Sequence, residues 1–585
     1  MGLRSVRPNG RPTIERYREG CAIEMKRTAA WLLALSLAAV PALAACGKDE
    51  AGGTKPPADA GKAGIGTETA APKTVPEKYD PPIELTTVNY SFPTTKFFNG
   101  EDINNNIWVR TIAEKYGIKV KTQWYVPSTE YEKKTNLMIA SGDIPDFFAA
   151  TPQQFRQLYE AGQLEEMTKL YNDYAPESVK KVMAGAGETV LKSATIDGKL
   201  MAIPWTGVAK EGPAILWIRK DWKEKLQLPD PKTIDDLFAI ADAFVKKDPD
   251  GNGKDDTFGL AMDKDLGMAG GIMQGYGAYL DATTGFWIKD ASGRLAAGDI
   301  QPEMKKALAK LSEMYKAGHF DPEFIVKDPN KVYETIGGNK IGMMIGGRGS
   351  ANSPLVTLTP NQEWQAYEMP TVDGKPFKAQ LPLNIFSYYW VVKKGTKHPE
   401  AIFKMMDFWL QTYYYNKSED VYYKFIVPSK EDQSAIWTYS PVKIYLPDNN
   451  IENYRQATAV LDGKIKPEEL APERKKVYDR IMLYKGGQKN LWGEFAQNGP
   501  GGSAGIIDRI IKEDRFVPNQ FYTTPTATMA ERNEQLKKLR IETFVKIVTG
   551  NLPLDAFDKF VADWKKQGGD MITKEVNDWY AAQTK

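Results

Sequence analysis

Oxygen-bearing groups recur at every second position between residues 248 and 256. The oxygens that we expect to bind an ion belong to Asp248, Asp250, Asn252, Lys254 (through its backbone carbonyl) and Asp256. Gly253 allows the sharp turn that such a loop requires. Because Ca²⁺ prefers hard oxygen ligands of this kind, the pattern predicts a structural Ca²⁺ site. The alternative is a solvated turn that the Asp and Asn side chains stabilise by themselves.

The same spacing resembles the first half of an EF-hand loop. At the twelfth position, however, Gly259 stands where an EF-hand has a bidentate Glu. The residues around it, 258–262, have the pattern of a strand rather than of an exiting helix. We therefore expect a loop pinned by calcium and not a calcium sensor.

Cys46 is the residue with the most specific covalent chemistry. It follows Lys26 and Arg27, an apolar run over residues 28–45 and small residues immediately before it. This is the pattern of a secretory signal, and a Cys at its end resembles the lipobox of bacterial lipoproteins. The resemblance implies a lipoprotein signal peptide over residues 25–45 and a mature chain that begins at Cys46. A lipid on that thiol would tether the protein to the extracellular face of the cell membrane. The alternative is a transmembrane anchor, since roughly eighteen residues just span a bilayer.

Two flanking segments carry no expected fold. Residues 1–24 contain five Arg and no apolar periodicity, so we interpret them as an extension upstream of a true start at Met25. Residues 46–82 are rich in Gly, Ala, Pro, Lys and Thr. Such a composition buries too little apolar surface to offset the entropy of ordering, which predicts a disordered tether.

Composition excludes several classes of function. Residues 1–45 hold seven of the 77 basic and three of the 75 acidic residues, which leaves 70 and 72 and a mature net charge of −2. This balance argues against a nucleic-acid partner. The mature chain has no Cys besides Cys46, and its histidines are His319 and His398. Zinc sites, Cys nucleophiles and His-based triads are therefore not expected, and we predict no enzymatic activity.

The folded part is expected to begin at residue 83. The first elements read as strands over 85–90, 118–122 and 146–148, separated by helices over 104–116 and 131–141. Later segments include helices that begin at Thr233 and at His398-Pro399, a helix over 304–316, a buried strand over 341–345 and an apolar helical face over 557–564. This alternation predicts an α/β fold in which ligands bind at the carboxyl ends of parallel strands. A mature chain of about 540 residues is longer than a single hydrophobic core can organise, so at least two lobes are expected.

Several short motifs occur in a fixed order along the chain. They are Asp-Ile-Pro-Asp at 143–146, Ile-Pro-Trp at 203–205, Ile-Arg-Lys-Asp-Trp at 218–222, the oxygen-rich loop, and Phe-Tyr-Thr-Thr-Pro-Thr-Ala-Thr-Met at 521–529. Together they resemble extracellular solute-binding proteins of family 1. The most similar members are the large oligosaccharide-binding lipoproteins of Gram-positive bacteria, which are related to alginate-binding periplasmic proteins.

The resemblance spans residue 83 to the end. It implies a periplasmic-binding-protein type II fold, in which residues 83–585 form two discontinuous α/β lobes with a hinge and an interlobe cleft. It also implies an oligosaccharide ligand, the permease subunits of an ABC transporter as partners, and calcium in the oxygen-rich loop. Thr257 follows that loop where relatives often carry an acidic residue. We expect a monomer.

Aromatic rings pack on the apolar faces of sugars, so Trp and Tyr near expected loops are candidate ligand residues. The candidates are Trp205, Tyr276, Trp287, Tyr389 and Trp390, with Arg348 as a partner for a carboxylate if the sugar is a uronate. Core packing is the alternative for each ring. At the level of function, an extracellular carbohydrate-active enzyme and a peptide-binding receptor are the alternatives.

Overall fold

A computed structural model describes residues 75–92, 95–280, 285–432 and 434–583. All described residues belong to one compact unit. The upstream extension, the signal-like segment, Cys46 and residues 46–74 of the expected tether lie outside the described residues.

Ordered contacts begin before the expected boundary at residue 83. Tyr79 is 5% exposed, its backbone N–H donates to the carbonyl of Tyr116, and its hydroxyl donates to Glu400 Oε1 at 2.9 Å. Gly117 lies directly against the Tyr79 carbonyl and has a φ of 67°. Any side chain at Gly117 would collide with that carbonyl, so this glycine both ends a helix and admits the incoming chain.

Three small sheets, β1-β2, β3-β14-β6 and β4-β5, form the first lobe. Its strands are β1 (Ile83–Ser91), β2 (Ile118–Pro127), β3 (Phe147–Ala150), β4 (Thr195–Ile196), β5 (Lys199–Leu200), β6 (Ile203–Thr206) and β14 (Ile385–Val392). β1 and β2 are parallel, as the opening pattern predicts, whereas β3 pairs with the distant β14, which runs antiparallel to both β3 and β6. Asp146 Oδ2 joins the sheets of β1 and β3 by accepting hydrogen bonds from the backbone N–H and hydroxyl of Thr86 at 2.7 and 2.6 Å.

Eight helices of the described chain surround these sheets. They are α1 (Ile107–Tyr116), α2 (Ser128–Ser141), α3 (Pro152–Glu160), α4 (Thr168–Tyr174), α5 (Glu177–Ala186), α6 (Glu188–Ser193), α13 (Ala401–Tyr413) and α14 (Glu419–Phe425). The Asn106 side chain caps α1 by accepting from the first free N–H groups. The helix expected from Pro399 begins at Ala401 instead, because the Ala401 N–H donates to the carbonyl of His398 in a preceding turn.

The second lobe is built on a four-stranded mixed sheet in the order β12-β7-β11-β8. The strands of this lobe are β7 (Ile215–Arg219), β8 (Phe258–Leu260), β9 (Trp287–Lys289), β10 (Leu295–Ala297), β11 (Ile341–Gly346), β12 (Trp364–Glu368), β13 (Ala379–Leu381) and β15 (Phe516–Pro518). β8 and β11 are parallel, and β7 runs antiparallel to its two neighbours. The ends of β8 and β11 therefore meet the beginning of β7 at one edge of the sheet.

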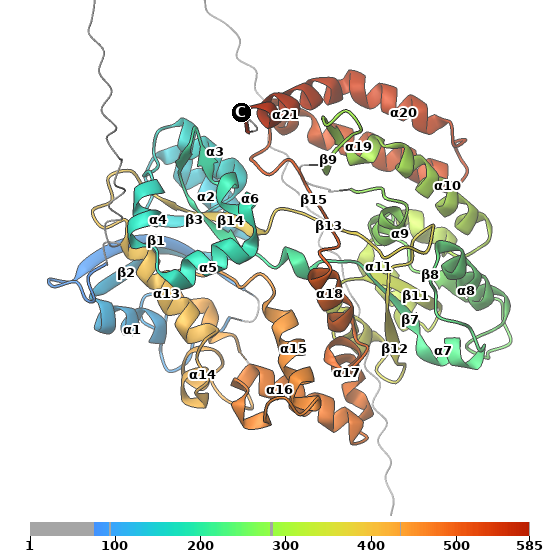
Figure 1. Ribbon diagram of the computed structural model, residues 1–585, viewed down its shortest axis with the longest axis horizontal. Helices are drawn as coiled ribbons and strands as arrows, with labels where there is room; N and C mark the ends of the chain where they lie inside the picture. The colour runs from blue at the N-terminus through green and yellow to red at the C-terminus, as the bar shows by residue number, and fades with distance from the viewer. Residues whose placement is uncertain (1–74, 93–94, 281–284, 433, 584–585) are drawn as a thin grey trace, which may run out of the picture. The chain divides into compact units, whose positions relative to one another are not determined.

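Helices cover this sheet and extend beyond it (Figure 1). They are α7 (Lys220–Lys225), α8 (Ile234–Lys246), α9 (Gly270–Gly275), α10 (Pro302–Lys316), α11 (Pro329–Gly337), α12 (Leu355–Leu358), α15 (Asn449–Leu461), α16 (Pro472–Lys485), α17 (Trp492–Asn498), α18 (Ser503–Lys512), α19 (Ala527–Val548), α20 (Ala556–Trp564) and α21 (Asp570–Gln583). The capping box expected at Thr233 forms with Asp236 and starts α8.

Buried apolar residues form two large clusters, one in each lobe, and a small third cluster between α15, α16 and α17. Within the described residues the chain passes between the two large clusters three times, through residues 206–214, 380–388 and 445–450. We call these segments the first, second and third crossings.

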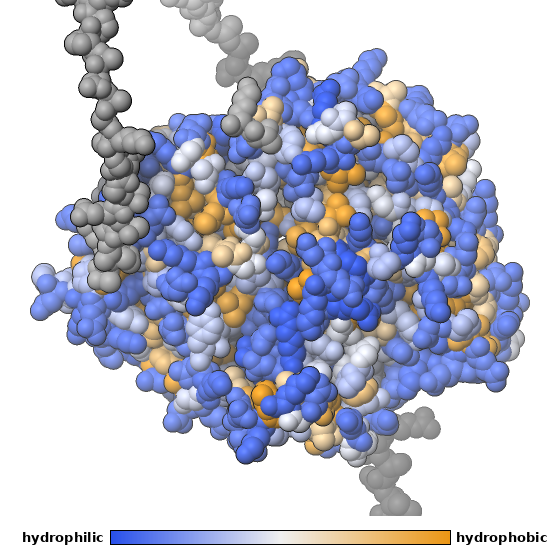
Figure 2. All heavy atoms as spheres, in the orientation of Figure 1, coloured by the Kyte–Doolittle hydropathy of each residue, from blue (hydrophilic) through white to orange (hydrophobic). Residues whose placement is uncertain are grey.

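The visible surface is mostly hydrophilic, with apolar residues in small scattered groups (Figure 2).

We expect Gly342→Ala to destabilise the second lobe. A Cβ at this buried position in β11 would lie 2.2 Å from the Phe244 ring and 2.9 Å from the Trp222 ring. Packed rings do not yield easily, and overpacking of this kind costs about 1–3 kcal/mol. Thermal unfolding followed by circular dichroism checks the loss.

Gly185→Ala is the matched control for Gly342→Ala. Gly185 is exposed in α5, and an added Cβ would meet its nearest atom at 3.8 Å. Helix propensity predicts no loss, and a gain of up to about 1 kcal/mol. Equal melting temperatures for the wild type and Gly342→Ala would contradict the packing at β11.

Candidate functional site

Half-buried aromatic rings gather where the strands of the first lobe end. β14 runs antiparallel to β3 and β6, so its opening residues Phe386 and Tyr388 lie beside the carboxyl ends of those strands. The ring centroids of Phe386 and Tyr445 are 5.1 Å apart, and those of Phe92 and Trp437 are 6.0 Å apart. We call this surface the aromatic face; its half-buried rings are those of Phe92, Trp124, Phe386, Tyr388, Trp437 and Tyr445.

Trp205 lies beneath the aromatic face and connects its rings. Its side chain is 1% exposed, and its centroid lies 5.0 Å from that of Trp390 and 5.4 Å from that of Phe386. The buried indole N–H of Trp205 has no hydrogen-bond partner among the described residues. A buried donor without a partner costs about 1–3 kcal/mol, so this position is not optimised for packing alone.

A buried lysine stands next to Trp205. Lys443 is 2% exposed, and its Nζ lies 5.9 Å from the Trp205 ring centroid and donates to the Ser440 carbonyl at 2.6 Å. Among the described residues no carboxylate forms an ion pair with it. Burial lowers the pKa of Lys443 from 10.5 to about 7, because the charged form loses its hydration.

Four of the rings predicted to contact a ligand lie in the two cores. Trp205, Trp287, Tyr389 and Trp390 are 1–3% exposed. The Tyr389 hydroxyl donates to Ser193 Oγ at 3.0 Å, and the Trp390 indole N–H donates to the Lys443 carbonyl at 2.8 Å. Rings that are covered in this way offer no face to a sugar, which favours a role in packing. Phe386 and Tyr388, the half-buried neighbours of Trp205, are the better candidates for contact with a ligand.

A cavity of about 600 Å³ opens at the edge of the second-lobe sheet where β8 and β11 end and β7 begins. We call it the glycine pocket, because its lining includes Gly212, Gly267, Gly270, Gly271, Gly346 and Gly347. Without side chains at these positions, backbone N–H and C=O groups are accessible to a ligand. The location agrees with the rule that ligands bind at the carboxyl ends of strands in α/β sheets.

Two glutamines add polar groups to the glycine pocket. Gln274 of α9 and Gln380 of β13 both line it, and the Gln380 N–H donates to Gln274 Oε1 at 3.1 Å. Tyr276, one of the candidate ligand residues, does not line the pocket. It ends α9 half-buried, beside charged residues of α8 and α10. Helix α9 thus reaches the pocket through Gly271 and Gln274 and not through Tyr276.

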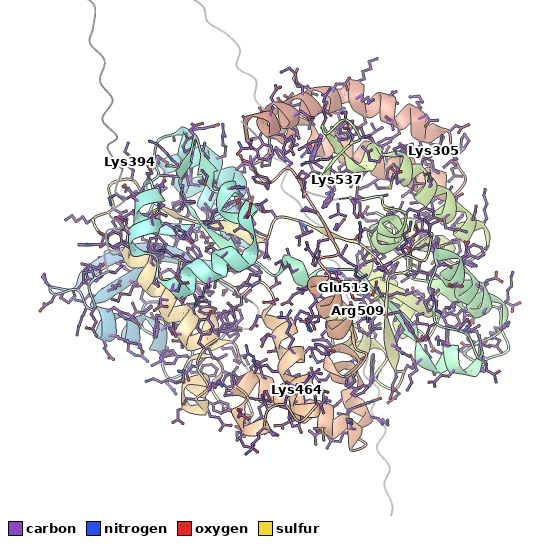
Figure 3. All side chains as sticks on the ribbon, viewed as in Figure 1. Lys305, Lys394, Lys464, Arg509, Glu513 and Lys537 are labelled. Atoms are coloured by element: carbon purple, nitrogen blue, oxygen red, sulfur yellow. The ribbon has the colours of Figure 1, made fainter. Side chains whose placement is uncertain are left out.

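Three charged residues complete the lining of the glycine pocket. Lys537 and Arg540 come from α19, and Asp265 comes from the loop after β8. Arg540 is 7% exposed, and its only ion pair in the described part of the chain is with Asp299 Oδ2 at 3.4 Å. Lys537 is labelled on the side of α19 that is turned towards β13 (Figure 3).

Arg348, predicted as a carboxylate partner, lies at the crossings. Its Nε is 3.5 Å from Glu211 Oε2, and Glu211 also accepts from the backbone and side chain of Asn450 at 2.8 and 2.7 Å. Burial raises the pKa of Glu211 and lowers that of Arg348. The pair therefore ties the first and third crossings to the loop after β11, beside the glycine pocket.

In the oxygen-rich loop the acidic side chains turn inward. The Asn252 side-chain N–H₂ donates to Asp250 Oδ2 at 2.9 Å and to Asp256 Oδ1 at 3.1 Å, and Asp248 Oδ2 accepts from the Gly253 N–H at 3.0 Å. These oxygens are the donor type that suits Ca²⁺. No group of three His, Cys, Asp or Glu side chains in the described residues is arranged to hold a metal ion. The loop thus fits calcium by its donors, and its oxygens would have to close further around an ion.

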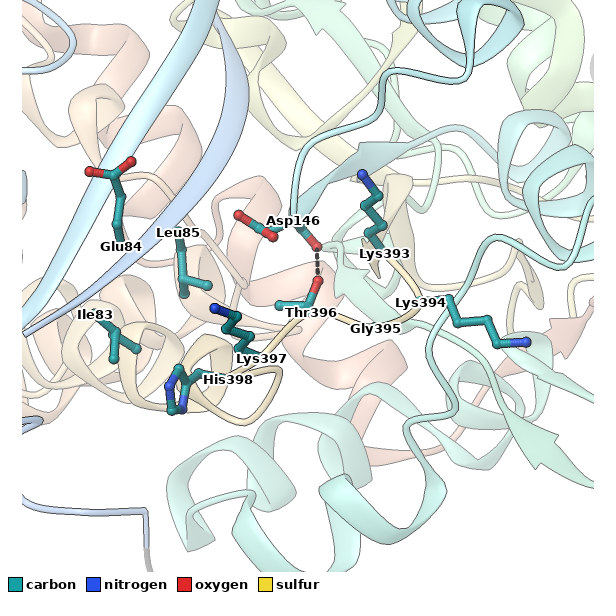
Figure 4. A pocket seen from close by; sticks show the side chains of 10 residues that line it. All are labelled: Ile83, Glu84, Leu85, Asp146, Lys393, Lys394, Gly395, Thr396, Lys397 and His398. Carbon is teal, nitrogen blue, oxygen red and sulfur yellow. Dashed lines mark hydrogen bonds between the residues drawn. The ribbon is translucent and has the colours of Figure 1, made fainter.

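A second cavity, of about 530 Å³, lies at the opposite edge of the first lobe (Figure 4). It is lined by the start of β1 and by residues 393–398 after β14. Its Asp146 is already bound to Thr86 and, through its carbonyl, to the Thr396 hydroxyl at 3.4 Å. Because this cavity faces the amino ends of the parallel strand β1 and of β3, we do not assign it to the ligand.

No helix in the described residues is both long and apolar enough to cross a membrane.

The family model described as bacterial extracellular solute-binding protein matches residues 108–431, more than half of the chain. The chain belongs to this family. This confirms the resemblance drawn from the ordered motifs.

Two relatives from Bacillus subtilis (strain 168) cover most of this solute-binding protein. Lipoprotein LipO is 24% identical over 489 residues, which cover 80% of this chain and 87% of LipO. The polygalacturonan/rhamnogalacturonan-binding protein YtcQ is 24% identical over 505 residues, with the same coverage. Among solved structures, an HMO binding ABC-transporter associated solute binding protein from Bifidobacterium longum infantis matches with a TM-score of 0.60 and 16% identity, over 86% of this chain and 99% of that chain. The two-lobed periplasmic-binding fold is thereby confirmed.

Sequence reasoning missed most of the lining of the glycine pocket in this solute-binding protein. The glycines at 346 and 347 directly follow a predicted buried strand, so the carboxyl-end rule gave a signal for them. Lys537 and Arg540 gave no signal, because they lie in a long helix with many other charged residues. Phe386 and Tyr388 were overlooked beside the more prominent Trp390.

We expect the stability of this solute-binding protein to rise with pH because of Lys443. Between pH 7 and 10.5 the unfolded chain keeps the proton on this amine and the folded chain does not, so stability increases across that window. Lys443→Met removes the penalty for the buried charge. The variant should therefore melt higher than the wild type at pH 6.5, and the difference should shrink by pH 9.5.

Lys417→Met, at an exposed position, is the control. Its melting temperature should differ from that of the wild type by the same amount at every pH. The measurement is a series of thermal melts of all three proteins in matched buffers. A constant difference between Lys443→Met and the wild type at every pH would contradict the buried, neutral amine.

Proposed function

We propose that this protein is a lipid-anchored receptor that captures an oligosaccharide outside the cell and delivers it to the permease of an ABC transporter. The observation that carries the proposal is the glycine pocket, with its backbone and amide groups at the carboxyl ends of strands, in a chain whose other lobe has the aromatic face. Sugar rings have apolar C–H faces that pack on aromatic rings, and hydroxyl groups that bind backbone and amide groups.

The comparisons support this proposal at the level of ligand class and location. YtcQ is named for binding polygalacturonan and rhamnogalacturonan, and the similar structure from Bifidobacterium is described as transporter-associated. LipO is named a lipoprotein, which supports lipidation of Cys46. We propose that lobe closure around the sugar creates the form that docks on the permease.

We also propose that the protein does not alter its ligand. The relatives are named as lipoproteins or binding proteins and not as enzymes. Glycoside hydrolysis requires a pair of carboxyl groups on either side of the scissile bond. Among the described residues Asp265 is the single carboxylate that lines the glycine pocket. A peptide ligand is the competing outcome of the binding experiment.

We expect purified protein to be stabilised against heat by oligosaccharides and not by peptides. A ligand at 100 times its Kd adds about 2.7 kcal/mol to stability by mass action. A thermal-shift screen of oligosaccharides, with a peptide library in parallel, measures this. Stabilisation by peptides alone would overturn the proposed ligand class, and release of new reducing ends from a bound glycan would overturn the absence of catalysis.

Gly347→Val tests whether the ligand occupies the glycine pocket. An added Cβ at Gly347 meets no atom within 4 Å, so the variant should fold with an unchanged melting temperature in the absence of ligand. Its branched side chain would project into the pocket and remove the ligand-induced shift. Gly185→Ala, at a position outside the pocket lining, should keep the full shift.

We further propose that the oxygen-rich loop binds a structural Ca²⁺ ion through the five residues named for it above. Support comes from the inward orientation of Asp250 and Asp256 towards Asn252. Calcium should raise the melting temperature of the protein, and EDTA should reverse the effect. Asp250→Asn should abolish this response, whereas Asp462→Asn, at a distant acidic position, should not. A melting temperature that is insensitive to calcium would overturn this part of the proposal.

A further inference from the structure

Two cationic side chains of one helix enter the lining of the glycine pocket together. Lys537 and Arg540 are three residues apart on α19, so they lie on the same face of the helix. Ile541, next to Arg540, also lines the pocket. By contrast Lys538 is exposed, and its Nζ lies 3.9 Å from Glu542 of the next turn. The chain thus places two basic residues of α19 in the pocket and leaves an adjacent one on the outside.

Arg540 is buried with most of its hydrogen-bonding capacity unused. A guanidinium has five N–H donors. In the described residues, Arg540 makes one hydrogen bond, from Nη1 to Asp299 Oδ2 at 3.4 Å. Its side chain is 9% exposed, so water compensates little of what is missing. A buried charge with so weak a partner is costly, and a second anion in the pocket would relieve that cost.

Lys537 has no anionic partner at all in the described part of the chain. It is half-buried and forms neither an ion pair nor a hydrogen bond there. Among the described residues, Asp265 supplies the single carboxylate of the pocket lining, and it is exposed to solvent on the loop after β8. The described part of the lining therefore carries two positive charges and one negative charge, and the better buried of these charges is positive.

We propose that the glycine pocket selects oligosaccharides that carry carboxylate groups, with Lys537 and Arg540 binding a carboxylate of the ligand. This inference rests on the proposed function, because it specifies the ligand of the same site. A guanidinium binds a carboxylate through paired, charge-assisted hydrogen bonds. The hydroxyl groups of a neutral sugar can accept hydrogen bonds from these donors, but they leave both positive charges uncompensated. Lys537 and Arg540 are thus the specificity-determining residues of the pocket.

The test compares acidic oligosaccharides with carboxyl-reduced counterparts that have the same skeleton. The probes are oligomers of galacturonate, of mannuronate and guluronate, and glucuronate-bearing xylan fragments, each paired with its reduced, neutral form. Calorimetry on the full chain should show at least one acid that binds about tenfold or more tightly than its neutral form at low salt, the ratio expected for charge-assisted hydrogen bonds. The ratio should fall as salt rises.

Lys537→Gln and Arg540→Gln should each remove most of this preference, and Arg540→Lys should keep part of it. A merely structural role would weaken the acid and the neutral sugar alike. Lys538→Gln is the matched control on the same helix and should keep the wild-type ratio. Melting curves show whether Arg540→Gln folds, and Lys537→Gln, at a half-buried position, tests the proposal independently.

Equal affinity for acid and neutral forms would overturn this inference and leave the proposed function intact. A preference for the acid that survives Lys537→Gln and Arg540→Gln would overturn the assignment of these residues. Binding of no oligosaccharide of either kind would overturn the inference and the proposed function together.

Discussion

The structure depends on how the three crossings between its two cores satisfy their polar groups. Asn384 of the second crossing accepts from the Ala209 N–H of the first at 2.8 Å. Thr206 donates its hydroxyl to the Tyr445 carbonyl at 2.6 Å, and Glu211 binds Asn450 of the third crossing. Buried polar groups that are paired across the crossings hold these segments in one arrangement, since separating them would leave buried groups without a partner. We expect any movement of the lobes to pivot about this network.

The same network sets the position of the glycine pocket. Gly212 and Ala214, at the end of the first crossing, line the pocket, and Glu211 precedes them in the chain. Gly347 lies next to Arg348, which pairs with Glu211. The backbone proposed to face the ligand is thus adjacent in sequence to the groups that join the crossings. A ligand bound to these glycines would act on the segments that connect the lobes, which is the coupling that the proposed capture-and-delivery receptor requires.

Local signals in the sequence predicted local structure well. The capping box at Thr233 and the C-cap at Gly117 both form, because their hydrogen bonds involve residues a few positions apart. The pairing of β3 with β14 was not predictable in this way, since it joins segments far apart in the chain. The burial of individual side chains was harder still to predict from the sequence. Trp390 and Tyr388 are two residues apart on the same strand, yet one is covered by Trp205 and Lys443 and the other remains half-exposed. That difference is set by packing from Trp205 and Lys443, which are distant in the chain, so the local sequence carries no information about it.

Two buried basic side chains are exceptions to the otherwise consistent burial of apolar groups in this fold. Lys443 lies beneath the aromatic face without a carboxylate, and Arg540 lies in the glycine pocket with one long contact. A chain selected for stability alone would replace such groups with apolar ones, because an uncompensated buried charge lowers stability. Local violations of this kind are expected where function requires them. Arg540 lines the glycine pocket, and Lys443 is covered beneath the aromatic face, the two surfaces proposed to contact the ligand. For Arg540, a ligand of the proposed class would offset part of the cost in folding free energy.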